Sequence, residues 1–152
     1  MRKIGNILWH FPFFGFIDAI VAWFMGFILV ITVVGAPIGL GLMQWSKFLL
    51  APFSWTMVDK GDLNIEENKL WKSFGLIVRI IYFPFGLLLT VSLFIQIILL
   101  AISVVGIPMA IILAKSLSTA FNPVGKVCVP GAVSRELERR QDEKIANKYL
   151  NK

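Results

Sequence analysis

Two long apolar runs dominate the pattern of hydrophobic and polar positions along the chain. Phe14–Val34 contains one charged residue, Asp18, and Phe85–Val105 contains none. Each run has about 21 residues, and at a rise of about 1.5 Å per residue it would form a helix of about 31 Å. That length matches the roughly 30 Å hydrocarbon core of a bilayer. The pattern therefore predicts two membrane-spanning helices.

Each apolar run ends in the sequence Gly-x-Pro. Glycine can adopt the backbone angles that a chain reversal needs, and proline suits the first turn of a new helix. The segments that follow, 38–51 and 109–120, are less apolar and contain lysine, serine, threonine and glutamine. We expect each to form a shorter helix that returns along the first. The residues that build these two structural turns are Gly35, Pro37, Gly106 and Pro108.

A second proline, Pro52 or Pro123, ends each returning segment, and a short β-like run follows it. The two runs are Trp55–Val58 and Lys126–Val129. Valine, threonine and cysteine at these positions favour strand pairing.

These features occur twice, and each is separated from its second occurrence by the same number of residues as Gly35 is from Gly106. A constant separation of this kind indicates a duplicated unit. We call this separation the repeat offset. The Gly-x-Pro turns, the second prolines and the β-like runs all keep it. The sequence therefore divides into a first membrane repeat, a polar linker, a second membrane repeat and a C-terminal tail, at residues 5–58, 59–72, 73–129 and 130–152.

The predicted fold is an all-α integral membrane protein with two tandem helical hairpins, each a transmembrane helix plus a shorter returning helix. The tail, from Ser134 onward, is expected to be a cytoplasmic helix with ion pairs between Glu136 and Arg140 and between Arg139 and Glu143. If the two hairpins insert in the same sense, a pseudo-two-fold axis along the membrane normal relates them. The β-like runs can then pair as a short cytoplasmic ribbon, with Met57 close to Cys128.

A second topology is open, in which each repeat crosses the membrane once and its polar arm lies on the far surface. The central linker contains Lys60, Lys69 and Lys72, and translocated segments are poor in Lys and Arg. This distribution favours hairpins with the N-terminus, linker and C-terminus cytoplasmic and both Gly-x-Pro turns facing the periplasm. A single crossing would place the two β-like runs on opposite sides of the bilayer.

Composition agrees with a membrane protein. Hydrophobic residues make up 57% of the chain and charged residues 16%, whereas soluble domains average roughly 45–50% and 25%. The net charge of +6 does not indicate nucleic acid, because the basic residues form no run and lie at the ends of apolar segments. The single cysteine excludes an internal disulfide.

The repeated motif resembles the YccF-type inner membrane component domain of bacteria. The best match runs from Val105-Gly106-Ile107-Pro108 through Lys115 to Pro123-Val124-Gly125-Lys126, and the first copy is looser, with Ser54 in place of the glycine after Pro52. The resemblance covers both copies, roughly residues 5–130. It implies a bacterial inner-membrane location and paired domains, with no established biochemical activity. With the predicted hairpins, we expect a multi-pass protein of the bacterial inner (plasma) membrane.

Residues for catalysis are scarce, and we expect no enzyme, metal site or cofactor. Histidine occurs once, at His10 in an aromatic cluster, where a hydrogen bond to water or backbone is the simplest role. Cys128 lacks a partner to activate it, so packing on a strand is the expected role.

Polar residues inside the apolar segments are the candidate functional residues, because each is costly in hydrocarbon. Asp18 can reach the headgroups, pair with Arg79, or line an ion or solute path. Ser92, Gln96 and Ser103 are spaced to share one helix face, as hydrogen-bonding contacts between helices or as a pore lining. Lys47 and Lys115 lie on equivalent arms and can extend to the cytoplasmic surface or attract an anion.

Two functions follow from these residues. The first is a homo-oligomeric pore, transport component or accessory to one, which takes a small ion or solute. The alternative is a structural module without transport, whose lysines bind the headgroups of anionic membrane lipids.

Overall fold

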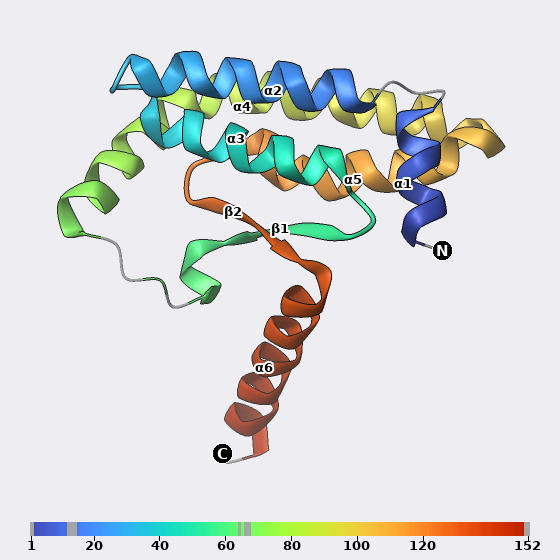
Figure 1. Ribbon diagram of the computed structural model, residues 1–152. Coiled ribbons are helices and arrows are strands. Elements are labelled where there is room, and N and C mark those ends of the chain that lie inside the picture. Colours follow the sequence, from blue (N-terminus) through green and yellow to red (C-terminus); the bar gives the residue numbers. More distant parts are fainter. Residues whose placement is uncertain (1, 12–14, 64, 66–67, 151–152) are drawn as a thin grey trace.

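The computed structural model describes residues 2–11, 15–63, 65 and 68–150. The chain is mostly helical with one small sheet, and Figure 1 shows its elements in space. The helices and strands are α1 (Arg2–His10), α2 (Gly15–Ile31), α3 (Ala36–Leu50), β1 (Trp55–Asp59), η1 (Lys60–Leu63), α4 (Lys69–Ile102), η2 (Val104–Gly106), α5 (Ile107–Phe121), β2 (Lys126–Pro130) and α6 (Gly131–Leu150).

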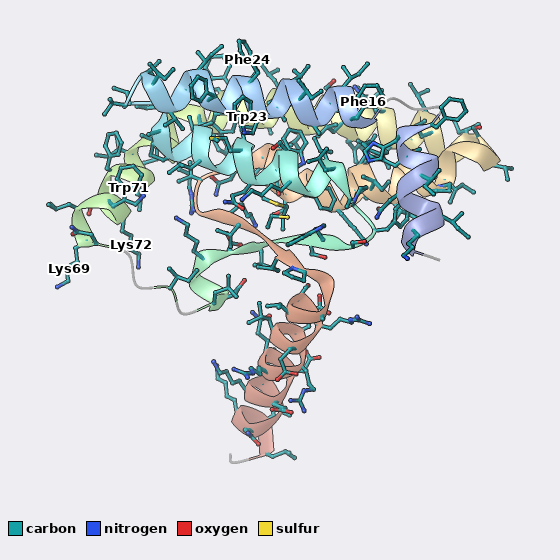
Figure 2. The ribbon with its side chains drawn as sticks, viewed as in Figure 1. Phe16, Trp23, Phe24, Lys69, Trp71 and Lys72 are labelled. Atoms are coloured by element: carbon teal, nitrogen blue, oxygen red, sulfur yellow. The ribbon has the colours of Figure 1, made fainter. Side chains whose placement is uncertain are left out.

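The elements form three levels. In Figure 1, α2 and most of α4 lie along the top, α3 and α5 lie beneath them, and the two strands cross below. The helices α1, η1 and α6 lie on the side of the strands. The level formed by α2 and α4 carries the large exposed apolar side chains, including Phe24, which points away from α3 in Figure 2.

Helix α2 is shorter than the predicted first span. It has 17 residues, about 25 Å, because the chain turns between Thr32 and Gly35 before the apolar run ends. The start of that run, together with Pro12, lies outside the described residues. Within the described part of the chain, α4 is the one helix long and apolar enough to cross a membrane.

Both Gly-x-Pro turns form where predicted, but their glycines do not have the special backbone angles that were expected of them. Gly35 and Gly106 have right-handed helical backbone angles, and the positive φ in the first turn belongs to Val33 at 59°. A Cβ atom at Gly35 would lie 2.9 Å from the Thr32 Oγ1 and one at Gly106 would overlap the Leu100 carbonyl. Glycine is therefore required for close approach. Proline lies in the first turn of both α3 and α5, as predicted.

A proline inside a helix often breaks or kinks it, but Pro84 does not end α4. α4 continues through Pro84 for 34 residues, and its first part descends from the helical layer in Figure 1. Proline removes one backbone hydrogen bond and bends a helix without ending it when the packing on both sides is kept. A single stripe supplies that packing, with Val78 and Gly86 buried and Tyr82 and Thr90 partly buried.

Small residues let the first two helices approach closely. Gly15, Ala19, Ala22 and Gly26 form the buried stripe of α2, at helical spacing. A Cβ atom on Gly26 would lie 2.7 Å from the carbonyl oxygen of Gly39 in α3. Such stripes bring helix backbones into van der Waals contact, which is a frequent basis of helix association in membranes.

The ends of α3 and α5 receive equivalent hydrogen bonds. The Trp9 Nε1 donates to the carbonyl of Leu49 at 2.7 Å, and the Tyr82 hydroxyl donates to the carbonyl of Ala120 at 3.2 Å. Leu49 and Ala120 are separated by the repeat offset, as are the bounds of α3 and α5 and those of β1 and β2. An aromatic side chain, from α1 in the first copy and from α4 in the second, thus satisfies a carbonyl near the end of each helix.

The predicted ribbon is present. β1 and β2 pair antiparallel, with Met57 directly opposite Cys128 and Asp59 opposite Lys126. Met57 and Cys128 are equivalent positions of the two copies and lie at the centre of the ribbon. The pairing excludes the single-crossing topology, which requires the two strands on opposite sides of a bilayer.

The expectation that the two hairpins insert in the same sense is wrong. In Figure 1, α2 and α4 run in opposite directions, and the two Gly-x-Pro turns lie at opposite ends of the layer. In agreement, Asp18 near the start of α2 and Gln96 near the end of α4 line the same cavity. The antiparallel direction of the helices follows from the direction in which each strand leaves its helix pair. β1 runs back beneath α3, so antiparallel strands impose antiparallel helices as well.

Helix α6 is polar and projects away from the helical layer. The predicted ion pairs are confirmed, with 3.1 Å between Glu136 and Arg140 and 3.4 Å between Arg139 and Glu143. Hydrogen bonds from Arg139 and Arg140 hold the pKa of the exposed Glu136 at about 2. Gln141 donates to Asp62 at 3.1 Å and so connects α6 to η1.

The ribbon register predicts a specific disulfide. Directly opposed strand residues have Cβ atoms about 4.5–5.5 Å apart, close enough for a cysteine at position 57 to bond to Cys128. The variant Met57→Cys should therefore crosslink within one chain under mild oxidation, detected by altered gel mobility without reductant. Burial raises the pKa of the Cys128 thiol to about 11, partly offset by Lys47, so the rate should increase with pH.

The control for this crosslink is Val58→Cys, because the neighbouring strand residue points to the other face. Equal crosslinking of both variants, or free thiols in Met57→Cys after oxidation, would contradict the register.

A second prediction concerns Gly41, where α3 meets the segment before β2. A Cβ atom there would overlap the carbonyl oxygen of Pro123, whereas one at Gly61 would meet nothing within 4 Å. Glycine-to-alanine changes usually favour a helix by about 1 kcal/mol. We expect Gly41→Ala instead to lower the free energy of unfolding by about 1–3 kcal/mol, as overpacking does.

Thermal unfolding in detergent measures this effect, with Gly61→Ala as the matched control. An unchanged or higher midpoint for Gly41→Ala would show that α3 and Pro123 are not in contact.

Candidate functional site

A basic pocket of about 390 Å³ lies where α3, α4 and the ribbon meet. Four basic side chains and one acidic side chain line it: Lys60, Lys72, Arg79, Lys126 and Asp59. Trp71 also lines the pocket, and aromatic residues of this kind are enriched at the headgroup level of membranes. The excess of positive charge makes the pocket suited to an anion.

The ribbon and the end of α5 hold the two inner basic groups. The Lys126 side chain is 10% exposed, and its Nζ donates to the Asp59 Oδ2 at 2.8 Å. The guanidinium of Arg79 donates to the carbonyl of Val124 at 3.3 Å, and Arg79 keeps further donors for a ligand because a guanidinium has five. Lys126 is therefore held in place by its carboxylate partner, while Arg79 can still bind a second acceptor.

The outer basic groups come from the N-terminal end of α4. Lys72 is exposed, and Figure 2 shows Lys69 and Lys72 on the side of the strands, below the apolar layer. Asn68 caps this N-terminus, because its side chain accepts a hydrogen bond from the Leu70 N–H at 3.2 Å. The positive helix terminus and its lysines thus face the same region as the pocket.

A second cavity, of about 860 Å³, shares Arg79, Asp59 and Lys126 with the first. Its other walls are largely apolar and come from α4 and α5, at Phe83, Thr90, Ala114, Leu117, Ser118, Phe121 and Asn122. Phe83 and Phe121 pack edge to face with ring centroids 5.7 Å apart. Charged side chains and largely apolar walls thus line the same groove, and a phospholipid combines a charged group with apolar chains in the same way.

The sequence reasoning missed this site. Arg79, Asp59 and Lys126 are far apart along the chain, and their types form no motif. One signal was present. If Met57 faces Cys128 in an antiparallel ribbon, Asp59 must face Lys126, so the expected register already placed this ion pair.

Two of the predicted residues do come together. Asp18 and Gln96 line a cavity of about 340 Å³ between α2, α3 and α4. Trp45 lines the same cavity, and its buried Nε1–H has no hydrogen-bond partner among the described residues. Asp18 and Arg79 line different cavities, and Arg79 bonds to Val124 instead of the expected carboxylate.

The remaining candidates are dispersed. Ser103 lies past the end of α4 with extended backbone, so only Ser92 and Gln96 remain on the helix face that was expected to carry three polar residues. Ser92 is exposed and does not line the Asp18 cavity. Lys47 and Lys115 are exposed on α3 and α5 and line neither the basic pocket nor the Asp18 cavity.

His10 and Cys128 have structural surroundings. The His10 Nε2 donates to the carbonyl of Leu50 at 2.8 Å, as expected for a ring bonded to the backbone. Cys128 packs against the main hydrophobic core, and its backbone N–H donates to the Gln44 side chain at 3.3 Å. The raised thiol pKa of about 11 keeps Cys128 protonated near neutral pH.

Residues 4–55 match the profile of the YccF family, described as an inner membrane component domain. The match covers about a third of the chain and one copy of the repeated pattern. No curated protein and no solved structure matches the chain. The match to this family, together with the one helix of spanning length among the described residues, indicates a component of the inner membrane.

Proposed function

We propose that the chain is a non-enzymatic module of the bacterial inner membrane that binds the headgroup of an anionic phospholipid in the basic pocket. The single observation that carries this proposal is that the two cavities share Arg79, Lys126 and Asp59 in their walls. Arg79 and Lys126 lie at the junction of a basic pocket and a groove with apolar walls. Anionic headgroups attract basic residues at a membrane surface with about 1 kcal/mol for each Lys or Arg.

The site has a place for each part of the lipid. The phosphate binds between Arg79, Lys72 and Lys60, while Asp59 holds Lys126 beneath it. An acyl chain follows the groove past Phe83 and Phe121. Guanidinium groups bind phosphate oxygens with two parallel hydrogen bonds, and this favours Arg79 as the main contact.

In this proposal residues 73–129 are a second copy of the domain matched at residues 4–55. The repeat offset relates α3 to α5, β1 to β2, and the two bonded carbonyls at the helix ends, and this agreement supports the proposal. The two copies differ at one pocket position. Arg79 of the second copy corresponds to Leu8 of the first, so only the second copy has a basic residue there. Association with further copies of the chain remains a prediction.

The lipid proposal predicts selective retention of anionic lipid. Purified protein incubated with equal amounts of phosphatidylglycerol and phosphatidylethanolamine should retain mainly phosphatidylglycerol, measured by native mass spectrometry. Arg79→Gln should reduce this preference by about fivefold, the equivalent of about 1 kcal/mol.

The control is Lys148→Gln, which removes the same charge from the far end of α6. Equal retention of the two lipids by the unaltered protein, or an equal loss of preference in Lys148→Gln, would contradict a specific headgroup site.

The Asp18 cavity favours a second function, passage or binding of a small ion or solute. Three polar side chains converge on an otherwise apolar space there, and the Trp45 Nε1–H lacks a partner within the described residues. One chain encloses no path across a bilayer with this cavity alone. A transport role therefore needs several copies or a partner.

This second function predicts flux across reconstituted liposomes that depends on Asp18 and Gln96. Asp18→Asn and Gln96→Leu should each reduce it severalfold, because they remove the carboxylate and the amide that face the solute. Ser92→Ala is the control, since Ser92 lies outside the cavity. Flux equal to that of protein-free liposomes would exclude the transport role.

A further inference from the structure

The elements are arranged in a way that a pair of bilayer-crossing hairpins does not explain. The strand β2 lies against the middle of α3, because the Cys128 N–H donates to Gln44, which is near the midpoint of that helix, at 3.3 Å. Gly41 packs on Pro123 in the same region. Along the helix axes, the ribbon is therefore at the centre of the layer.

If these helices crossed the membrane, the ribbon would lie at the middle of the hydrocarbon. The ion pair of Lys126 and Asp59 would then be at that depth. Helix α6, which leaves the ribbon directly, would carry exposed Arg139 and Arg140 into the same plane. Charged side chains cost at least about 2.5 kcal/mol each at the bilayer centre. A spanning orientation is thus strongly unfavourable for this chain.

The helix lengths give an independent argument. α2 has 17 residues and α3 and α5 have 15 each, which corresponds to about 25 Å and about 22 Å. All three are shorter than the roughly 30 Å of hydrocarbon that a spanning helix has to cross, whereas α4, with 34 residues, is long enough to cross it. In Figure 1, α2 and α4 are antiparallel and the two Gly-x-Pro turns lie at opposite ends of the layer. If the layer lies along a membrane surface, both turns are at the same depth and neither has to cross the bilayer.

The distribution of charge gives the direction of insertion. The exposed side chains of α2 and of the 86–102 part of α4 are mostly apolar. The one charged residue of these two segments is Asp18, which is exposed and also lines the Asp18 cavity. The helices α1, η1 and α6 are on the opposite side, and so are Lys69 and Lys72 at the start of α4 (Figures 1 and 2). Two helix layers, at about 8–10 Å each, have a depth similar to one leaflet.

We propose that the chain inserts into one leaflet only, with α2 and residues 86–102 of α4 lying parallel to the membrane plane. The surface that these helices present contacts the hydrocarbon of that leaflet. The pseudo-two-fold axis of the ribbon is then the membrane normal, and the ribbon, linker and α6 lie at the cytoplasmic surface. This inference rests on the proposed membrane function and assigns its orientation.

Membrane depth along α2 distinguishes the two orientations. Ile20, Phe24 and Ile28 are exposed and lie on one helix face at four-residue spacing. We would place spin labels at Ile20→Cys, Phe24→Cys and Ile28→Cys in a Cys128→Ser background and reconstitute each variant in phosphatidylglycerol-containing liposomes. Collision with oxygen and with a water-soluble nickel complex then reports the depth of each label.

The in-plane orientation predicts the same depth at all three positions, to within about 3 Å, with low exposure to nickel. A spanning helix predicts depths that spread by about 12 Å over eight residues, and this result would overturn the inference. Asn147→Cys on α6 serves as the water-exposed control. High nickel exposure at all three α2 positions would contradict membrane insertion itself and hence the proposed function.

Discussion

The antiparallel pairing of β1 with β2 is the constraint on which the rest of the structure depends. It joins the two halves of the chain at Met57 and Cys128, and it brings Asp59 to Lys126. Each strand follows its helix pair through a proline-containing turn and runs back beneath it, so the direction of the strands also sets the direction of the helices. The two helix pairs also share one hydrophobic core, in which Phe48 and Leu49 of α3 lie with Met109 and Ile112 of α5.

In this arrangement, exposed apolar residues lie on the level of α2 and α4, and charged residues lie mainly on the side of the strands. A helix that crosses a membrane would instead have its charged residues at its two ends. The level formed by α2 and α4 keeps large apolar side chains exposed, such as Ile20 at 61% and Leu88 at 69%. Soluble proteins rarely expose contiguous apolar surface of this extent. The basic pocket lies at the boundary between this level and the polar side, where a headgroup and its acyl chain would each meet a matching surface.

Much of this fold was predictable because its signals are local. The Gly-x-Pro turns, the returning helices, the paired strands and the α6 ion pairs follow from turn chemistry, periodicity and spacing. The relative direction of the two hairpins was not predictable from the repeat. A two-fold axis makes the helices of the two copies parallel if they lie along the axis, and antiparallel if they lie across it. Pro84 was also misleading, since the packing of Gly86 against the Phe121 carbonyl keeps α4 continuous. The basic pocket depends on long-range placement of Arg79, and only its Asp59–Lys126 pair followed from the expected register.

The central claim is that one antiparallel ribbon orients the apolar helices along a single leaflet. Oriented-sample solid-state NMR of the protein labelled with 15N-leucine tests it most directly, because many of the leucines lie in α2, α3, α5 and the 86–102 part of α4. The in-plane orientation predicts that most amide signals lie at the end of the 15N range that is characteristic of helices perpendicular to the membrane normal. Signals concentrated at the opposite end, as given by helices parallel to the normal, would contradict it.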